Sequence, residues 1–442
     1  MKKIRLVLLV CLLLAAAAAG SAIAEDIGAG KEHPCIRIVT EDGQPILSRE
    51  EYVPAVVQVF NCDKAYEMAE EGGVRVRGNS TAEQGEEKPY RIRFEKKHNM
   101  LGLHDGRAYR NWVLLRTYWH LCPDYMAFRL AGTIFGGKYY SSDCMFVNLY
   151  LNDRDLGVYL LCEQNQAAKK RMDVFEPEKG DKETKIGYLL EMENYPDDEH
   201  PGFGIGEKPY TEDIAGRKRV VPGRYYAIKS DIWGEEQELY IENWLTGAYS
   251  VLYEAAVNGK AMKLNENLKT EPAEEMTPFE AVNELLDLES LADMLILEEL
   301  VQNYDVGAGS FYMAVDFSED SLYEKLTFLG PWDFSWGYTE PADGGYYAST
   351  FQNMIQGMDN SNPWFVLAMK MEAFQTIVRD RWKKLSDSGA LTDTTIRVLA
   401  DIEALAGDLG EENAEKLEKG REIVEYVNAR IRWLDEQWNE DE

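Results

Sequence analysis

Two aspartates in the second half of the chain have a spacing that suits metal-assisted phosphoryl transfer. Asp305 ends a long helical pattern, Ser310 lies five positions later, and Asp333 follows a short apolar strand pattern at residues 325–329. In phosphoryl transfer, a first aspartate orients the hydroxyl nucleophile, a residue five positions on binds a metal, and a later aspartate holds Mg²⁺ against the phosphates. The three positions fit that chemistry, although two carboxylates at this spacing are weak evidence when taken alone.

Phosphoryl transfer also needs cations, and the first half of the chain supplies them. Five basic residues fall within a short stretch of an otherwise acidic protein: Arg75, Arg77, Lys88, Arg91 and Arg93. Such cations neutralise the charge of phosphate groups. The turn at Gly78-Asn-Ser80 could bring backbone amides to an anion as well. The alternation of these residues also fits an ordinary solvated strand face, and taken alone it favours that interpretation.

The basic cluster lies among segments with the period-two alternation of β-strands. Asn152-Asp153 is the turn of a predicted hairpin. In two of the strands, the basic residues lie on the face opposite the apolar one. The predicted strands are residues 36–39, 55–60, 74–77, 90–94, 111–115, 145–151, 157–161, 187–191, 225–229, 311–315 and 325–329.

Helical periodicity dominates the later part of the chain. Helices are predicted at 123–135, 235–258, 278–304 and over most of 366–438. Residues 196–224 are rich in Pro, Gly and charge and are predicted to form a long surface loop, and residues 261–277 a linker or mobile loop. A β-rich front half that leads into a helical back half indicates an α+β, two-lobed catalytic domain.

Four parts are expected along the chain: a signal peptide (1–24), an N-terminal β segment (25–73), a central domain (74–365) and a helical C-terminal extension (366–442). The signal peptide is predicted from Lys2, Lys3 and Arg5, an apolar run, and small residues up to Ala24, after which cleavage is expected. The apolar run is too short for a permanent membrane span, and no later segment is long and apolar enough for one. We therefore expect a secreted, extracytoplasmic protein.

The composition excludes some classes of protein and partner. Hydrophobic residues at 45% and aromatic residues at 11% exclude a disordered chain. The formal net charge of −31 argues against nucleic acid or anionic lipid as a partner, because their phosphates would be repelled.

The cysteines indicate neither a dense disulfide scaffold nor a zinc site. Five remain beyond the predicted signal peptide, and their spacing contains no CxxC pattern. Cys35 and Cys62 flank early strands and are a candidate bridge. Cys144 and Cys162 lie in neighbouring predicted strands, where they are expected to act as apolar fillers.

An ordered series of short motifs carries a family resemblance. It opens with Arg77-Gly-Asn-Ser-Thr81 and Lys88-Pro-Tyr-Arg-Ile-Arg-Phe94. It continues through Leu101-Gly-Leu103, Asn111-Trp-Val-Leu-Leu115, Leu149-Tyr-Leu-Asn152, Gly157-Val-Tyr-Leu-Leu-Cys-Glu-Gln164 and Gly187-Tyr-Leu-Leu-Glu191, and closes with Asn303-Tyr-Asp305 and Gly330-Pro-Trp-Asp-Phe-Ser-Trp336. Over about residues 74–338 the chain resembles the CotH-like kinase family (spore coat protein H and relatives). The ordered series is more specific than any single block.

The resemblance implies an atypical protein-kinase-like fold for residues 74–365. It also implies transfer of the ATP γ-phosphate to Ser or Thr of a secreted, surface or coat protein, with Mg²⁺ or Mn²⁺ as cofactor. It makes Asp305 the candidate catalytic residue and Asp333 a metal ligand, with Ser310 and Ser335 at further metal-binding positions. Arg77, Lys88 and Arg91 or Arg93 become candidate phosphate contacts. Glu163 or Glu191 becomes a candidate partner that orients a basic residue.

Departures from the family pattern leave a second function open. The family usually has Asn where this chain has Ser310, and Asp where it has Ser335. Serine can ligate Mg²⁺ but supplies no charge, so metal affinity should fall. The basic and acidic residues usual around 118–125 are also replaced. A catalytically degenerate, kinase-shaped binding module in surface or coat assembly is therefore the alternative. Carbohydrate recognition, suggested by 25 tyrosines and 10 tryptophans, is a third and weaker hypothesis.

Local sequence context gives further expectations for individual side chains. Asp333 lies between Trp332 and Phe334, which predicts a buried carboxylate with a metal or a basic partner. Glu163 lies in an otherwise apolar strand, which predicts an inward-facing, paired carboxylate. Trp332 and Trp336 are expected to be core aromatics.

Overall fold

The computed structural model describes residues 28–78, 82, 88–116, 123–193, 196, 199–214, 217–319, 321–351, 359–410 and 414–439. The predicted signal peptide, most of the predicted turn after Gly78, and residues 117–122 lie outside the described residues. Two compact units divide the chain. The first comprises residues 1–125, 143–164 and 397–422, and the second comprises 126–142, 165–396 and 423–442.

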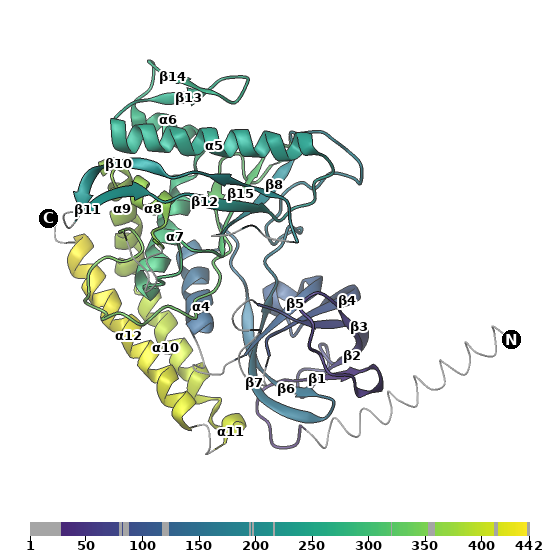
Figure 1. Cartoon of the computed structure of the whole chain (residues 1–442). Helices are drawn as coiled ribbons and strands as arrows, with labels where there is room; N and C mark the ends of the chain where they lie inside the picture. The colour runs from purple at the N-terminus through teal and green to yellow at the C-terminus, as the bar shows by residue number, and fades with distance from the viewer. Residues whose placement is uncertain are drawn as a thin grey trace. The chain divides into compact units, whose positions relative to one another are not determined.

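A closed seven-stranded β-barrel forms the first unit (Figure 1). Its strands run in the order β1-β2-β3-β4-β5-β7-β6, and the parallel pairing of β1 with β6 closes it. The predicted turn Asn152-Asp153 joins β6 to β7 with both residues at positive φ, as a tight hairpin requires. The strands are β1 (Cys35–Thr40), β2 (Val53–Phe60), β3 (Met68–Val76), β4 (Tyr90–Asn99), β5 (Ala108–Arg116), β6 (Cys144–Leu151) and β7 (Arg154–Glu163).

Alternation along β3 and β4 separates an apolar face from a basic one, as the sequence predicted. Val74, Val76, Ile92 and Phe94 are buried. The arginines between them project from the opposite face of the barrel wall, because successive side chains of a strand point to opposite sides.

Residues 397–422, far along the chain, also belong to the first unit. The carboxylate of Asp408, in the short helix α11 (Ala406–Leu409), accepts hydrogen bonds from the backbone N–H groups of Glu32 and His33 and lies 2.6 Å from His33 Nδ1. The α10 helix (Ala390–Glu403) precedes α11. Residues far apart in sequence therefore join one unit.

The second unit is built on a five-stranded sheet with the order β16-β15-β8-β12-β9. One face packs against helices, because Tyr188 of β8 stacks on Tyr240 of α5 and Tyr226 of β12 contacts Trp364 of α8. The sheet strands are β8 (Gly187–Glu193), β9 (Gly202–Ile205), β12 (Arg224–Ile228), β15 (Phe311–Asp316) and β16 (Thr327–Phe328), and the two helices are α5 (Glu235–Asn258) and α8 (Pro363–Ala368).

Further helices surround the segment that leads to Asp305. The pattern predicted as one helix over 278–304 is two helices, α6 (Pro278–Leu285) and α7 (Leu288–Val301). Asp287 caps α7 by accepting from the backbone N–H of Ser290. Arg381 of α9 (Glu372–Ser388) forms an ion pair of 2.7 Å with the buried Asp293 of α7. The second unit also contains most of α4 (Pro123–Phe135) and most of α12 (Ala414–Asn439).

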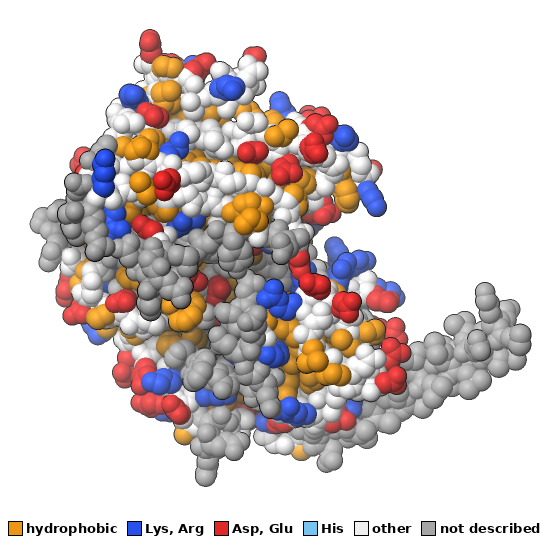
Figure 2. Space-filling model, in the orientation of Figure 1, with side chains coloured by type: hydrophobic (Ala, Val, Ile, Leu, Met, Phe, Trp, Pro, Cys, Tyr) orange, Lys and Arg blue, Asp and Glu red, His pale blue; other side chains and the backbone are white. Residues whose placement is uncertain are grey.

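Two predicted loops contain strands. Residues 196–224 hold β9 together with the β10–β11 hairpin (Lys208–Ile214 and Arg217–Val221), and residues 261–277 hold the β13–β14 hairpin (Met262–Leu264 and Thr270–Pro272). The loop predictions were wrong because glycine, proline and charge hide the alternation within 196–224, and because β13 and β14 are too short, with three residues each, to show any alternation. No helix among the described residues is long and apolar enough to cross a membrane. Acidic side chains are spread over the face seen in Figure 2.

Candidate active site

Asp305 lies in the turn that follows α7. Gln302 ends the helix in the left-handed conformation, and the side chain of Asn303 accepts a hydrogen bond from the backbone N–H of Asp305 at 3.2 Å. The Asp305 carboxylate in turn accepts a hydrogen bond of 2.9 Å from Asn360 Nδ2. Asn303 thus fixes the backbone of Asp305, and Asn360 fixes its carboxylate.

The segment before α8 holds the Asp305 turn in place. Asn360 Nδ2 also donates to the carbonyl of Tyr304, and Asn362 Nδ2 donates to the carbonyl of Val306. The buried guanidinium of Arg224 donates to the carbonyls of Gly307, Asp359 and Ser361, so it links the turn to this segment directly. These bonds make residues 304–307 and 359–362 one structural element.

Asp333 lies in a second turn, after β16. Its backbone is left-handed, with φ of 63°, and its side chain is exposed. The expectation of a buried carboxylate was wrong, because the left-handed turn directs Asp333 outward while Trp332 and Phe334 enter the core. Ser335 Oγ donates to the Asp333 carboxylate at 3.1 Å, and Asn303 Nδ2 donates to the Asp333 carbonyl at 3.3 Å.

The two aspartates are close enough to interact electrostatically. Burial, and then the charge of Asp333, raise the pKa of Asp305 to about 6, although the hydrogen bond from Asn360 lowers it. A neighbouring carboxylate disfavours ionisation in this way, and a cation between the two groups would remove the cost. The structure therefore brings Asp305, Asp333 and Ser335 into one neighbourhood.

The donors of this neighbourhood suit a hard divalent cation. Mg²⁺ prefers oxygen ligands and is usually held by one or two carboxylates, with water and substrate phosphates as its other ligands. Asp305, Asp333 and the hydroxyl of Ser335 are such donors. Among the described residues no group of three or more His, Cys, Asp or Glu side chains forms a complete metal cage. Ser310 lies at the other end of the Asp305 turn, also with positive φ, of 55°.

An exposed aromatic side chain contacts the residue that precedes Asp305. Trp336 is 46% exposed and its ring lies 5.5 Å from that of Tyr304, between centroids. Trp332 belongs to the core, as predicted, but the expectation that Trp336 would be buried was wrong. The difference follows from the turn at Asp333, after which Trp336 is directed toward solvent.

The two candidate glutamates have basic partners that the sequence did not indicate. Glu191 of β8 forms an ion pair of 3.0 Å with Lys229, which also lies 3.2 Å from His200 Nδ1. Glu163 of β7 is fully buried, as predicted, and lies 2.7 Å from His104 Nδ1. The hydrogen bond to Glu163 is the main reason that the pKa of His104 is raised. Glu191 belongs to the second unit, and Glu163 to the first.

The predicted phosphate-binding residues all belong to the first unit. Arg75 and Arg91 are direct cross-strand partners, and Arg93 follows on the same face. The guanidinium groups of Arg75 and Arg93 lie over the Tyr52 ring, at 5.3 and 6.0 Å from its centroid. The backbone N–H of Arg77 donates to the Pro89 carbonyl next to Lys88, so the ends of both strands are joined.

Several residues that position the site were missed by sequence reasoning. Asn360 and Arg224 act on the Asp305 turn from distant parts of the chain, and Lys229 and His104 pair with the candidate glutamates. The one usable signal was Asn360-Ser-Asn-Pro363, in which an asparagine before a proline predicts a helix N-cap. Asn362 does cap α8 in this way.

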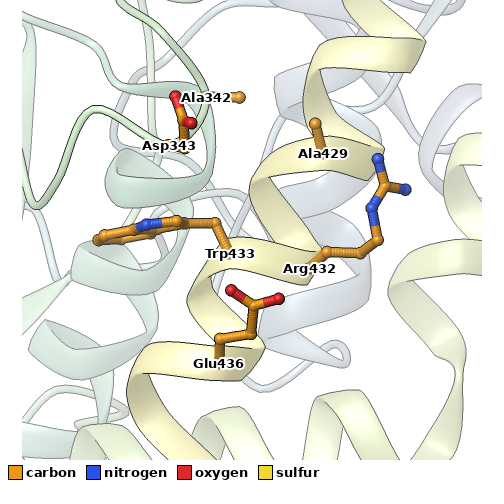
Figure 3. Close-up of a pocket in the computed structure, with 6 residues that line it drawn as sticks. All are labelled: Ala342, Asp343, Ala429, Arg432, Trp433 and Glu436. Carbon is orange, nitrogen blue, oxygen red and sulfur yellow. The ribbon is translucent and has the colours of Figure 1, made fainter.

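A shallow surface hollow of about 350 Å³ lies elsewhere in the second unit (Figure 3). Ala342 and Asp343 form one side, and the α12 residues Ala429, Arg432, Trp433 and Glu436 form the other. None of the candidate catalytic or metal-binding residues lines this hollow. It is open, small and of mixed polarity, so we assign it no role in the chemistry.

Comparison with protein-family profiles matches residues 74–435 to the family described as CotH kinase protein. The chain belongs to the CotH kinase family. The match covers most of the chain and includes the Asp305 turn, the Asp333 turn and the basic strands. Membership in the CotH kinase family indicates a kinase-like protein. A search of curated proteins finds no match.

Proposed function

We propose that this chain is a two-lobed, protein-kinase-like phosphotransferase of the CotH kinase family. It transfers the γ-phosphate of MgATP to a Ser or Thr hydroxyl of an extracellular, surface or coat protein. The observation that carries the proposal is the Asp305–Asp333 pair, in which Asn303 contacts both turns and the charge of Asp333 disfavours ionisation of Asp305. Repulsion between the two carboxylates destabilises the folded protein when no cation is bound, and a bound cation would relieve it.

Each residue has a defined part in the proposed reaction. Asp305, held by Asn360, orients the acceptor hydroxyl and takes its proton, and a pKa near 6 places this group close to neutral pH, where a general base works best. Asp333 and Ser335 would hold Mg²⁺, which when bound neutralises phosphate charge. Arg77, Lys88, Arg91 and Arg93 would bind the phosphates. Glu191 would keep Lys229, and Glu163 would keep His104, in a fixed orientation.

Calorimetry with ATP and Mg²⁺ tests this assignment. Asp333→Ala should abolish Mg²⁺-dependent ATP binding, because it removes the exposed carboxylate that would hold the metal. Asp343→Ala removes another exposed acid of the same unit and should leave binding unchanged. Equal ATP affinity in the wild type and Asp333→Ala would remove the metal role from Asp333.

The second candidate function is a degenerate binding module in surface or coat assembly, and Ser310 and Ser335 favour it. Thermal unfolding with ATP and Mg²⁺ or Mn²⁺ distinguishes the two, because a ligand of the native state raises the melting temperature. Stabilisation by nucleotide and metal together supports the kinase. A melting temperature unmoved at millimolar ligand, but raised in Ser335→Asp, would indicate a site that has lost its metal through that serine.

A further inference from the structure

The β6–β7 hairpin of the barrel places two thiols opposite one another. Cys144 of β6 and Cys162 of β7 are direct cross-strand partners, and both are fully buried. The four described cysteines are all reduced in this structure. The candidate bridge between Cys35 and Cys62 is therefore not formed, and the thiols that face each other across a sheet are a different pair.

The backbone hydrogen bonds define the kind of site that this pair occupies. The backbone N–H of Glu163 donates to the carbonyl of Asp143 at 3.3 Å, and the backbone N–H of Cys144 donates to the Asp143 side chain. Bonded and non-bonded pairs alternate along an antiparallel ladder, so Cys144 and Cys162 form a non-hydrogen-bonded pair. Cα atoms in such pairs are about 4.5 Å apart, within the range that a disulfide spans.

We propose that Cys144 and Cys162 are a disulfide site, oxidised when the chain folds in an oxidising compartment. A thiolate of one cysteine attacks the disulfide of an oxidant, either oxidised glutathione or a thiol oxidoreductase, and releases one oxidant thiol. The second cysteine then attacks the mixed disulfide and releases the other. Two protein thiols and one oxidant disulfide become one protein disulfide and two oxidant thiols.

Burial determines when the bond forms. Burial, and then the neighbouring Cys144 thiol, raise the pKa of Cys162 well above its ordinary value. The folded, reduced protein therefore presents little thiolate, and the thiolate is the species that reacts. Oxidation occurs while β6 and β7 are pairing and before folding buries the two thiols.

The bond would lie in the barrel wall that carries the basic residues. One row of cross-strand partners runs from Cys144 through Cys162 and Val113 to Arg91 and Arg75. Partners in a row share a face of the sheet, so the thiols and these two arginines lie on the same face. The disulfide fixes the register of this wall, and this inference does not depend on the proposed phosphotransfer.

Mass spectrometry of the full chain tests the proposal. The protein is exported to an oxidising compartment, denatured, alkylated without reductant and digested. We expect a Cys144–Cys162 crosslinked peptide, with Cys35 and Cys62 alkylated as internal controls. Alkylation of Cys144 and Cys162, or linkage of either to another cysteine such as Cys122, would overturn the proposal.

A variant pair extends the test to stability. In the exported protein, reductant should lower the melting temperature of the wild type and of Cys35→Ala. The double variant Cys144→Val, Cys162→Val should not respond to reductant, because it lacks the bond and fills the same volume with apolar groups. A reductant response retained by the double variant would contradict the assignment.

Discussion

Two carboxylates six residues apart on one segment, Glu299 and Asp305, differ in the charges and hydrogen-bond donors that surround them. Glu299, near the end of α7, is fully buried and pairs at 2.9 Å with the fully buried Arg430 of α12. Its carboxylate also accepts hydrogen bonds from the backbone N–H groups of Tyr347 and Ser349 and from the Ser349 hydroxyl. Asp305 instead accepts from one amide and faces a second carboxylate, Asp333.

The difference separates a structural centre from the proposed functional centre at Asp305 and Asp333. Burying a charge is tolerated when it is paired and fully hydrogen-bonded, as at Glu299. The Asp305–Asp333 pair meets neither condition among the described residues, so its arrangement costs stability, and the proposed cation would remove that cost. Charged groups that destabilise the ligand-free protein in this way are often found at functional sites.

The largest effect is expected from breaking the structural centre. Arg430→Ala leaves the Glu299 carboxylate buried without its cation and should lower the free energy of unfolding by about 3–5 kcal/mol. Arg432→Ala, two positions along the same helix and exposed, should change it by less than about 0.5 kcal/mol. Chemical denaturation of both variants measures the contrast. Similar losses in the two variants would show that Arg430 contributes only helix packing.

Breaking the functional centre should act in the opposite direction on stability. Asp305→Asn removes the like-charge repulsion and should raise the free energy of unfolding by roughly 1–2 kcal/mol at pH 7. The same change removes the proposed general base and should lower the phosphotransfer rate roughly 10²- to 10⁴-fold. A phosphate-transfer assay and urea unfolding on one preparation give both values. Loss of stability together with activity would place Asp305 with the structural centre.

Glu298 is a third carboxylate to compare. It is the immediate neighbour of Glu299, but it lacks an ion-pair partner among the described residues. Burial raises its pKa to about 8, opposed by a hydrogen bond from Asn303. The folded state therefore keeps a proton that the unfolded chain releases near its ordinary pKa, and stability is lost as pH rises from about 4.5 to 8. Glu298→Gln should remove this loss, on the order of 4 kcal/mol, in unfolding curves at pH 5 and 8.5. An unchanged pH slope would mean that Glu298 is ionised in the fold.

The smallest effect is expected from Asn360, which orients Asp305. Asn360→Ala should cost about 1 kcal/mol of stability and lower kcat more than it raises KM, because the acceptor is misaligned rather than lost. Thr277→Ala removes the cap of α6 at a similar cost and should leave kcat unchanged. If both variants reduce kcat equally, the effect of Asn360 is general destabilisation.

The sequence was sufficient to predict the elements on which the site stands. Strict alternation in 74–77 and 90–94 predicted strands with an apolar and a basic face, and the hairpin at Asn152-Asp153 was identified from its turn residues. The spacing of Asp305 and Asp333 predicted two carboxylates at one site, and the pKa of Asp305 shows that their charges interact. These features depend on local patterns, which periodicity reveals. The catalytic and metal-binding roles of the two aspartates stay predictions.

The partners of the charged residues could not be predicted, because they depend on tertiary contacts. Asn360 reaches Asp305 from 55 residues away, and no local pattern links the two positions. Lys229 meets Glu191 only because β12 pairs with β8. The outward direction of Asp333 depends on a left-handed backbone that the flanking aromatics concealed.

Gly307 shows what the docking of the Asp305 turn implies for mutational tolerance. A methyl group at this position would collide with the backbone of Asn360, Ser361 and Asn362, and backbone atoms cannot move aside as a flexible side chain can. In a saturation library selected for activity, position 307 should therefore return glycine alone, although its own atoms carry no chemistry. Constraint in this protein thus extends to a residue whose only contribution is the space it leaves empty.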